Sequence, residues 1–473
     1  MAAQRSYGVE SAVARRAFRE YRHVTRAARR AWKAESDGLL MDNLMLNPKS
    51  FWKAVSQPHK GCKITDVREW TDYFKNLYKT DTKKPDMNDD LNLARERMFP
   101  LPSRLDISQA EHLNLPFSID EVNFALHHAS NGKSSGVDGL PMEFLKHAEI
   151  CNDDGTTNNI LSEHITVLFN RILLEGYPSD WSTCALAPVP KPKGDINNKD
   201  DHRGIAVGGA LSKLYSSVLL NRLDKWAERY QFRAAGQAGF RHSRGTPDNS
   251  FILNHIIDKY GSRSKPVFAA FIDFKKAYDW IDRDTLWQSL RCLGLHGPIL
   301  ESLISMYTNV NIRVRVGGKL GDVFSSLLGV KQGDALSPLL FGLFIDRFEK
   351  YIDEEYPNLG VQLKERLIRV LFYADDLVLL AESPTDLQLM LNALSKFSTL
   401  NSLTVNIKKS EAVIFNNTFC TDHVTLTFDG LPLEIKSMFI YLGMMFDESG
   451  SLEGAYNRSF SKGRAALYAL LRR

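Results

Sequence analysis

The first half of the chain is dominated by apolar positions that recur every three or four residues, which is the spacing of an amphipathic helix. This pattern covers residues 69–79, 160–176 and 210–230. A further stretch begins with Ser118 and Glu121, which are spaced to form a capping box, and runs to an Asn-Gly pair. We predict a helix at each of these positions.

The pattern changes from residue 266 onward. The apolar run "PVFAAFIDF" (266–274) is too short for an independent helix, so it predicts a buried strand that ends at Asp273. Residues 311–326 alternate between apolar and polar side chains and turn at Gly317-Gly318, which is typical of a hairpin. In "LIRVLFYADDLVLLAES" (367–383), two apolar strands flank a polar tip. This segment also predicts a hairpin.

Helical patterns continue between these strands. The segment "ALSPLLFGLFIDRFEKYI" (335–352) predicts a helix with Ser337 as its N-cap and Pro338 at the first helical position. Helices therefore precede the strands and also alternate with them. The predicted fold class is α+β, with a largely antiparallel sheet.

Composition indicates an ordinary globular protein. The chain has 473 residues, of which 44% are hydrophobic and 25% charged. It contains no run of the roughly 18 apolar residues that a membrane helix needs. The five cysteines are scattered, so they predict neither a zinc knuckle nor a disulfide framework. We expect an intracellular, reduced protein, with nucleus and cytoplasm both open.

Positive charge is concentrated at the N-terminus. The net charge of the whole chain is +4, whereas residues 1–35 alone carry nine Lys and Arg against three Asp and Glu. The basic residues recur at helical spacing within residues 13–33, opposite an apolar stripe. Two interpretations stay open at this point, a solvated face of a packed helix or a contact with nucleic-acid phosphates.

The acidic residues at the strand ends indicate the chemistry. Asp273 ends one predicted strand, and Asp375 and Asp376 lie in the turn of a hairpin that can pair beside it. Three carboxylates this close cannot all stay ionised without a cation. Carboxylate oxygens suit Mg²⁺, and two such ions about 4 Å apart can hold the attacking and leaving oxygens of a phosphoryl transfer. A cap or turn role would explain any one acid, but it does not explain the pair inside an apolar hairpin. We therefore predict a metal site.

Several motifs resemble those of the reverse transcriptases of non-LTR (LINE-type) retrotransposons. The blocks "FYADD", "FIDFKKAYD" and "GVKQGDALSPLLFGL" carry the likeness. Others follow in the family's order, namely "NGKSSGVDGLP", "VPKPKGD", "HRGIAVGGALSKLYSSVLLNRL", "QAGFRHSRGTPDN", "SLTVNIKKSEAVIF" and "FIYLGMMFD". The resemblance implies a right-hand polymerase with a palm and fingers, and an RNA-directed DNA polymerase activity.

The resemblance also implies roles for single residues. Asp273 and Asp375 would hold two catalytic Mg²⁺ ions, for which Mn²⁺ is an alternative, and Asp376 would assist them or order the turn. Lys409 would be the general acid that protonates pyrophosphate, with Lys408 as the competing candidate. In the family, such residues transfer a nucleotide from a deoxynucleoside triphosphate to a primer 3′-hydroxyl.

A second set would contact the incoming nucleotide: Lys191, Arg203, Phe274, Tyr278, Gln332 and Gly333. The two bases would neutralise the triphosphate, and the main chain at Phe274 would help accommodate it. The ring of Tyr278 would collide with a 2′-hydroxyl and so exclude ribonucleotides. Gln332 and Gly333 would line the floor where template and nucleotide pair.

The expected domain organisation follows from the motif positions. Residues 1–114 are expected to form a helical, basic N-terminal extension and linker, and residues 115–445 the fingers and palm. Residues 446–473 would be the start of a truncated thumb. The turn Tyr441-Leu442-Gly443 would grip the primer end.

The implied partners are an RNA template, a DNA primer and deoxynucleoside triphosphates, with no membrane. We expect an endonuclease on a separate or missing segment and leave the oligomeric state open. With RNA as the expected substrate, phosphate contact becomes the preferred role of the basic N-terminal helix. The alternatives are a catalytically weak, truncated or domesticated RNA-binding remnant, and a group II intron maturase, whose additional RNA-binding domain has no counterpart here.

Overall fold

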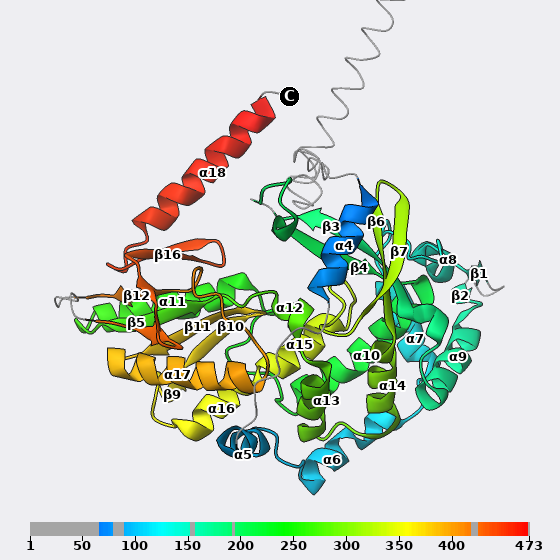
Figure 1. Cartoon of the computed structure of the whole chain (residues 1–473), viewed down its shortest axis with the longest axis horizontal. Coiled ribbons are helices and arrows are strands. Elements are labelled where there is room, and N and C mark those ends of the chain that lie inside the picture. Colours follow the sequence, from blue (N-terminus) through cyan, green and yellow to red (C-terminus); the bar gives the residue numbers. More distant parts are fainter. Residues whose placement is uncertain (1–65, 79–88, 152–156, 192–193, 418–423, 472–473) are drawn as a thin grey trace, which may run out of the picture. The chain divides into compact units, whose positions relative to one another are not determined.

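The computed structural model describes residues 66–78, 89–151, 157–191, 194–417 and 424–471 (Figure 1). The predicted basic helix at the N-terminus lies outside this range, as does most of the predicted linker. The chain divides into two compact units, and the larger one, Cys62–Tyr456, holds every strand described. The candidate site lies within this larger unit.

A five-stranded sheet forms one half of that unit (Figure 1). Its strands, in spatial order, are β10 (Val370–Tyr373), β11 (Asp376–Ala381), β5 (Val267–Ile272), β12 (Glu411–Phe415) and β15 (Glu434–Ile435). All neighbours are antiparallel except β12 and β15. The predicted strand before Asp273 and the predicted hairpin around the two adjacent acids are thus both confirmed.

Both faces of this sheet are buried, which explains why its strands are continuous apolar runs. Side chains alternate between the two faces along each strand. In β5, for example, Phe268 and Ala270 join the larger hydrophobic core, and Ala269 and Phe271 join the smaller one. Helix α17 (Pro384–Leu400) packs on the first face. The second face is covered by α11 (Thr246–Gly261) and by the hairpin of β16 (Met438–Tyr441) and β17 (Met444–Asp447).

A four-stranded sheet forms the other half of the unit. Its strands, in spatial order, are β4 (His202–Val207), β3 (Thr183–Pro190), β6 (Val310–Val316) and β7 (Lys319–Ser326). Strands β3 and β6 are parallel, and the other pairs are antiparallel. The predicted β6–β7 hairpin is confirmed by the pairing of Val316 with Lys319. Gly317 and Gly318 in its turn have φ values of 56° and 80°, a backbone conformation that favours glycine.

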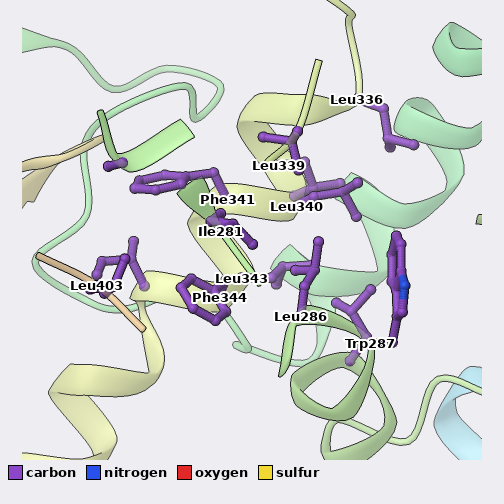
Figure 2. Close-up of a cluster of buried hydrophobic side chains, with 14 of the residues drawn as sticks. Ile281, Leu286, Trp287, Leu336, Leu339, Leu340, Phe341, Leu343, Phe344 and Leu403 are labelled. Atoms are coloured by element: carbon purple, nitrogen blue, oxygen red, sulfur yellow. The ribbon is translucent and has the colours of Figure 1, made fainter. Parts of the chain in front are cut away.

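Further helices complete this unit. The longer ones are α4 (Val67–Leu77), α7 (Ile119–His128), α9 (Ser162–Glu175), α10 (Ala210–Arg229), α13 (Arg283–Cys292), α14 (Gly297–Thr308) and α15 (Ser337–Ile345). Figure 2 shows Leu286 and Trp287 of α13 packed beside Leu340 and Leu343 of α15. The helix predicted to start with a capping box is α7, in which the Ser118 and Glu121 side chains do cap each other's backbone amides.

The remaining elements are short or peripheral, apart from α18 at the C-terminal end. They are α5 (Asp89–Met98), α6 (Arg104–Ala110), η1 (Glu111–Asn114), α8 (Met142–Lys146), β1 (Glu149–Cys151), β2 (Thr157–Asn159), η2 (Ser179–Ser182), η3 (Lys199–Asp201), α12 (Ala277–Trp280), α16 (Arg347–Glu355), β8 (Val361–Leu363), β9 (Arg366–Ile368), β13 (Thr427–Phe428), β14 (Leu431–Pro432) and α18 (Glu453–Leu471). None of the described helices is long and apolar enough to cross a membrane.

One feature differs from what the sequence predicts. Ser337 is the first residue of α15 and does not cap it, because its hydroxyl donates to the carbonyl of Lys331 instead. Helices α4, α5 and α6 belong to the same compact unit as the sheets, and the expected boundary at residue 115 stays a prediction. A side chain at Gly321 would even lie 2.4 Å from Thr71 of α4, so this helix packs directly on β7.

Candidate active site

The strand register brings the predicted acids to one edge of the five-stranded sheet. Leu377 of β11 pairs with Ile272 of β5, so the next positions along the two antiparallel strands are Asp376 and Asp273. Asp375 is the neighbouring residue in the hairpin turn. The turn depends on Ala374, which has a left-handed φ of 59° although it is not glycine.

Asp273 is also held by the segment before β12, which lies on the side of β5 opposite β11. The amide nitrogen of Asn406 donates to its Oδ2 at 2.9 Å, and the hydroxyl of Ser410 accepts from its backbone N–H at 3.1 Å. The segment that follows α17 is therefore bonded directly to the end of β5. Within the described part of the chain, no three His, Cys, Asp or Glu side chains are already arranged around one point as metal ligands.

Burial first, and mutual repulsion second, raise the pKa of the two turn acids. Burial raises the pKa of Asp375, its own backbone amide opposes that shift, and the carboxylate of Asp273 raises the pKa further. Asp376 is more exposed to solvent. Its partial desolvation and the charges of Asp375 and Asp273 nevertheless raise its pKa to about 6, against the weaker opposing charge of Arg203. A cation at this edge would relieve the repulsion.

The raised pKa of Asp376 predicts how the stability of the protein depends on pH. The folded-state pKa of Asp376, about 6, lies above the ordinary carboxyl value of 3.8, so the folded protein holds this proton more tightly. Metal-free protein should therefore lose stability as the pH rises from about 4 to about 6. Asp376→Asn should flatten that part of the curve and raise the melting temperature at pH 7.5. Melting curves across this pH range, with the exposed residue change Asp322→Asn as control, test this. Parallel curves for Asp376→Asn and the wild type would contradict it.

Basic side chains surround the same edge. Lys191 follows the end of β3 and Arg203 lies on β4, so both come from one hairpin of the second sheet. Burial lowers the pKa of Lys191 and the nearby charge of Lys409 lowers it further; Asp201 opposes the shift, and Arg203 and Lys276 add smaller decreases. A group of cations beside the acidic edge suits a polyanionic ligand.

Lys409 shares a hollow with two of the predicted acids. It lines a hollow of about 180 Å³ together with Asp273, Asp376 and Tyr441. Tyr441 is the last residue of β16, and Leu442 (φ 49°) and the glycine after it (φ 87°) turn the chain into β17. The turn expected to grip the primer thus lies next to the expected acids.

The residues predicted to contact the base and sugar of the incoming nucleotide lie outside the hollow that Lys409 lines. Tyr278 belongs to α12 and stacks on Phe341 of α15 with ring centroids 4.3 Å apart. Its hydroxyl is buried and has no hydrogen-bond partner among the described residues. Burial and then the charge of Asp375 raise its pKa well above the usual value. Phe274 is buried, and its backbone bridges to Val405.

Gln332 and Gly333 belong to a loop that packs on β4. The backbone carbonyl of Gln332 accepts from the N–H of Ala206 at 2.6 Å. Gly333 has a φ of 108°, and a Cβ atom there would lie 2.7 Å from the carbonyl oxygen of Ala206. The close approach of two backbones therefore requires glycine at this position.

The structure adds residues that the sequence did not single out. Asn406, which holds Asp273, lies within the quoted block "SLTVNIKKSEAVIF", but nothing in its spacing distinguishes it. Tyr73 of α4 donates to Asp200 at 2.8 Å, and Lys276 donates to the same carboxylate oxygen at 3.1 Å. Helix α4 is thereby tied both to the loop between β3 and β4 and to the loop after β5. No periodic pattern announces such contacts.

Comparisons with known proteins find reverse transcriptases and retrotransposon proteins. Residues 189–446 match the family described as "Reverse transcriptase (RNA-dependent DNA polymerase)". The chain is 27% identical over 358 residues to a retrovirus-related Pol polyprotein from the type-1 retrotransposable element R2 of Popillia japonica, a match that covers 74% of this chain and 47% of the relative. It is 26% identical over 369 residues to the RNA-directed DNA polymerase from the mobile element jockey of Drosophila funebris, covering 74% and 38% of the two chains.

A solved structure of telomerase from Candida albicans with a fragment of telomeric RNA is also similar, at 16% identity and a TM-score of 0.37. The match covers 59% of this chain and 47% of that one, and a likeness this weak supports no argument. The chain spans about half the length of the R2 polyprotein and less of the jockey polymerase.

Proposed function

The chain belongs to the reverse transcriptase family, as a reverse transcriptase domain of the non-LTR retrotransposon type, and we propose that it synthesises DNA on an RNA template. In this proposal it transfers a nucleotide from a deoxynucleoside triphosphate to the 3′-hydroxyl of a DNA primer. The observation that carries the proposal is the register that sets Asp376 opposite Asp273 at the end of β5. The family generally uses divalent metal ions.

The donor set suits such ions. Asp273, Asp375 and Asp376 offer hard carboxylate oxygens. Burial, followed by repulsion from the neighbouring carboxylates, raises the pKa of Asp375 and of Asp376, and a bound cation would oppose both effects. We propose that Asp273 and Asp375 hold two Mg²⁺ ions, with Mn²⁺ as a substitute, and that Asp376 assists. When bound, the ions would stabilise charge on the attacking and leaving oxygens. Asn406 would keep Asp273 oriented toward the site.

The basic residues have a matching role in this proposal. Lys191 and Arg203 would hold the triphosphate, and their fixed charges would oppose the charge that develops on the transferred phosphoryl group. Lys409, which shares a hollow with Asp273 and Asp376, would donate a proton to the leaving pyrophosphate. Its place in the hollow favours it over Lys408 for this role.

The nucleic acid would lie between these groups. The turn at Tyr441, Leu442 and Gly443 borders the same hollow, so it is placed to hold the primer end near the acids. The loop at Gln332 and Gly333 packs on β4 and would support the pair of template base and incoming nucleotide. Primer extension on an RNA template with labelled deoxynucleotides tests the proposal. Absence of any extension by folded protein, with Mg²⁺ or with Mn²⁺, would leave an RNA-binding remnant as the alternative.

Tyr278 provides a separate prediction about substrate choice. Tyr278→Val should lower the preference for deoxynucleotides over ribonucleotides by about 10-fold or more, because the ring that would meet the 2′-hydroxyl is gone. The measurement is the ratio of incorporation efficiencies for the two nucleotide types. Tyr278→Phe is the matched control, since the hydroxyl has no partner among the described residues and the ring stays stacked on Phe341. An unchanged ratio in the valine variant would place the selection elsewhere.

A further inference from the structure

The backbone turn that carries the acids is held by a residue far away in sequence. The N–H of Ala374 donates to Oε1 of Gln237 at 3.0 Å, and the N–H of Gly239 donates to the same oxygen at 2.8 Å. Gln237 is fully buried. A left-handed φ is unfavourable at an alanine, so this turn needs support from its surroundings.

The segment around Gln237 follows β10 like an additional strand. The N–H of Phe372 donates to the carbonyl of Gly236 at 3.0 Å, and the N–H of Ala238 donates to the carbonyl of Phe372 at 2.9 Å. A Cβ atom at Gly236 would lie 2.2 Å from the carbonyl oxygen of Val370. The glycine therefore permits the close approach that brings the Gln237 amide to the turn.

A buried ion pair fixes which way this amide points. Nε2 of Gln237 donates to Oδ1 of Asp346 at 2.9 Å, and Oδ2 of the same carboxylate accepts from Nε of Arg233 at 2.8 Å. The side chain of Asp346 is 1% exposed and that of Arg233 is 0% exposed. Because a carboxylate only accepts, it selects the NH₂ end of Gln237 and leaves the oxygen facing the turn.

The Arg233–Asp346 pair also lies close to the stacked rings of Tyr278 and Phe341. A Cβ atom at Gly342 would lie 2.5 Å from Nη2 of Arg233, and the residue before it, Phe341, carries the ring stacked on Tyr278. The charge of Arg233 is near enough to favour the ionised form of Tyr278, against the larger effects of burial and of Asp375. Replacing a buried ion pair by apolar side chains of similar volume often leaves stability unchanged, so stability alone does not explain the pair.

We propose that Gln237 is a positioning residue: its amide, oriented by the buried Arg233–Asp346 pair, holds the turn that presents Asp375 and Asp376 beside Asp273. The inference rests on the proposed function and deepens it. Gln237 touches no reacting atom and acts only through the turn. Loss of its acceptor should let the turn relax and should weaken cation binding by the acids.

The test compares full-length Gln237→Met with the wild type. Methionine keeps the length of the side chain but neither donates nor accepts strongly. We expect Mn²⁺ affinity, measured by electron paramagnetic resonance without nucleic acid, to fall about 10- to 100-fold, and the extension rate to fall by a similar factor. Raising the Mn²⁺ concentration should restore part of the rate, which a merely structural defect would not allow.

Gln388→Met is the matched control. This glutamine also bridges backbone groups, accepting from the N–H and donating to the carbonyl of Thr427, but it lies on α17 away from the acids. It should leave Mn²⁺ affinity and rate unchanged. Equal losses in both variants, or wild-type Mn²⁺ affinity in Gln237→Met, would overturn the positioning role.

A measurement on the wild type covers the case in which Gln237→Met does not fold. Amide hydrogen exchange of a peptide that contains Ala374 should be slow, because its N–H is buried and bonded. Exchange as fast as in an exposed loop would also overturn the proposal. Wild-type protein that binds Mn²⁺ without extending a primer would instead contradict the proposed function, and the Mn²⁺ comparison between variants would still decide the role of Gln237.

Discussion

Asp375→Asn should reduce primer extension by about 10³-fold while the protein remains folded, and Asp273→Asn should do the same. Each change removes a charged oxygen ligand, and a divalent cation contributes several kcal/mol to the stabilisation of a phosphoryl-transfer transition state. A loss of about 4 kcal/mol corresponds to about 10³-fold in rate. Single-turnover extension of a labelled primer at saturating nucleotide measures this directly.

The control for this experiment is Asp322→Asn. Asp322 lies exposed on β7 of the second sheet, so its substitution changes the net charge equally without touching the acidic edge. It should extend primers at the wild-type rate. If Asp375→Asn or Asp273→Asn kept more than about a tenth of the wild-type rate, these acids could not be the principal metal ligands.

Asp346→Ala should lower the free energy of unfolding by about 3–5 kcal/mol, the second large effect. The change leaves the guanidinium of Arg233 buried at 0% exposure without its carboxylate, and it also removes the acceptors for Gln237 and for the N–H of Ala234. Urea unfolding followed by circular dichroism measures the difference.

Asp353→Ala is its natural comparison, because Asp353 pairs with Arg369 while its own side chain stays 60% exposed. Breaking this exposed pair should cost only about 0–1 kcal/mol. The double variant Arg233→Met with Asp346→Leu should recover most of the stability lost in Asp346→Ala, yet it should not recover activity, since Gln237 remains unoriented. Equal losses of unfolding free energy in Asp346→Ala and Asp353→Ala would contradict the larger contribution of the buried pair to stability.

The parts of this structure that were predictable from sequence are those with a local signal. An apolar run that ends in Asp273, and two apolar runs around Asp375 and Asp376, are sufficient to predict the strands and the hairpin. Since strand pairing keeps residues at matching ends together, the meeting of these acids at one edge followed as well. The capping box at Ser118 is another local pattern, and the structure confirms it.

The parts that were not predictable depend on contacts between distant positions. Gln237 and Ala374 are 137 positions apart, and Asn406 and Asp273 are 133 apart, so no periodicity links them. Ser337 carried a local signal for an N-cap, but the carbonyl of Lys331 competes for its hydroxyl and wins. A single sequence shows which groups can form hydrogen bonds, whereas the packed fold decides which partners are in reach.

The ties of α4 illustrate the same limit. Its buried aromatic face was evident from spacing, and Trp70 and Phe74 are indeed buried. The hydrogen bond at its C-terminal end was not evident: the hydroxyl of the buried Tyr78 donates to Asp279 at 3.0 Å and so connects the helix to α12. Burial raises the pKa of Asp279 and the hydrogen bond from Tyr78 opposes the shift, with a net value of about 6.

The most direct test of the central claim is whether the order of bases in an RNA template determines the DNA that the protein makes. Full-length protein would be given a defined RNA template, an annealed DNA primer, Mg²⁺ and the four deoxynucleoside triphosphates, and the products would be sequenced. The proposal predicts DNA complementary to the template, formed by the wild type and lost in Asp375→Asn. Products that ignore the template sequence, or equal synthesis by the Asp375→Asn variant, would contradict it.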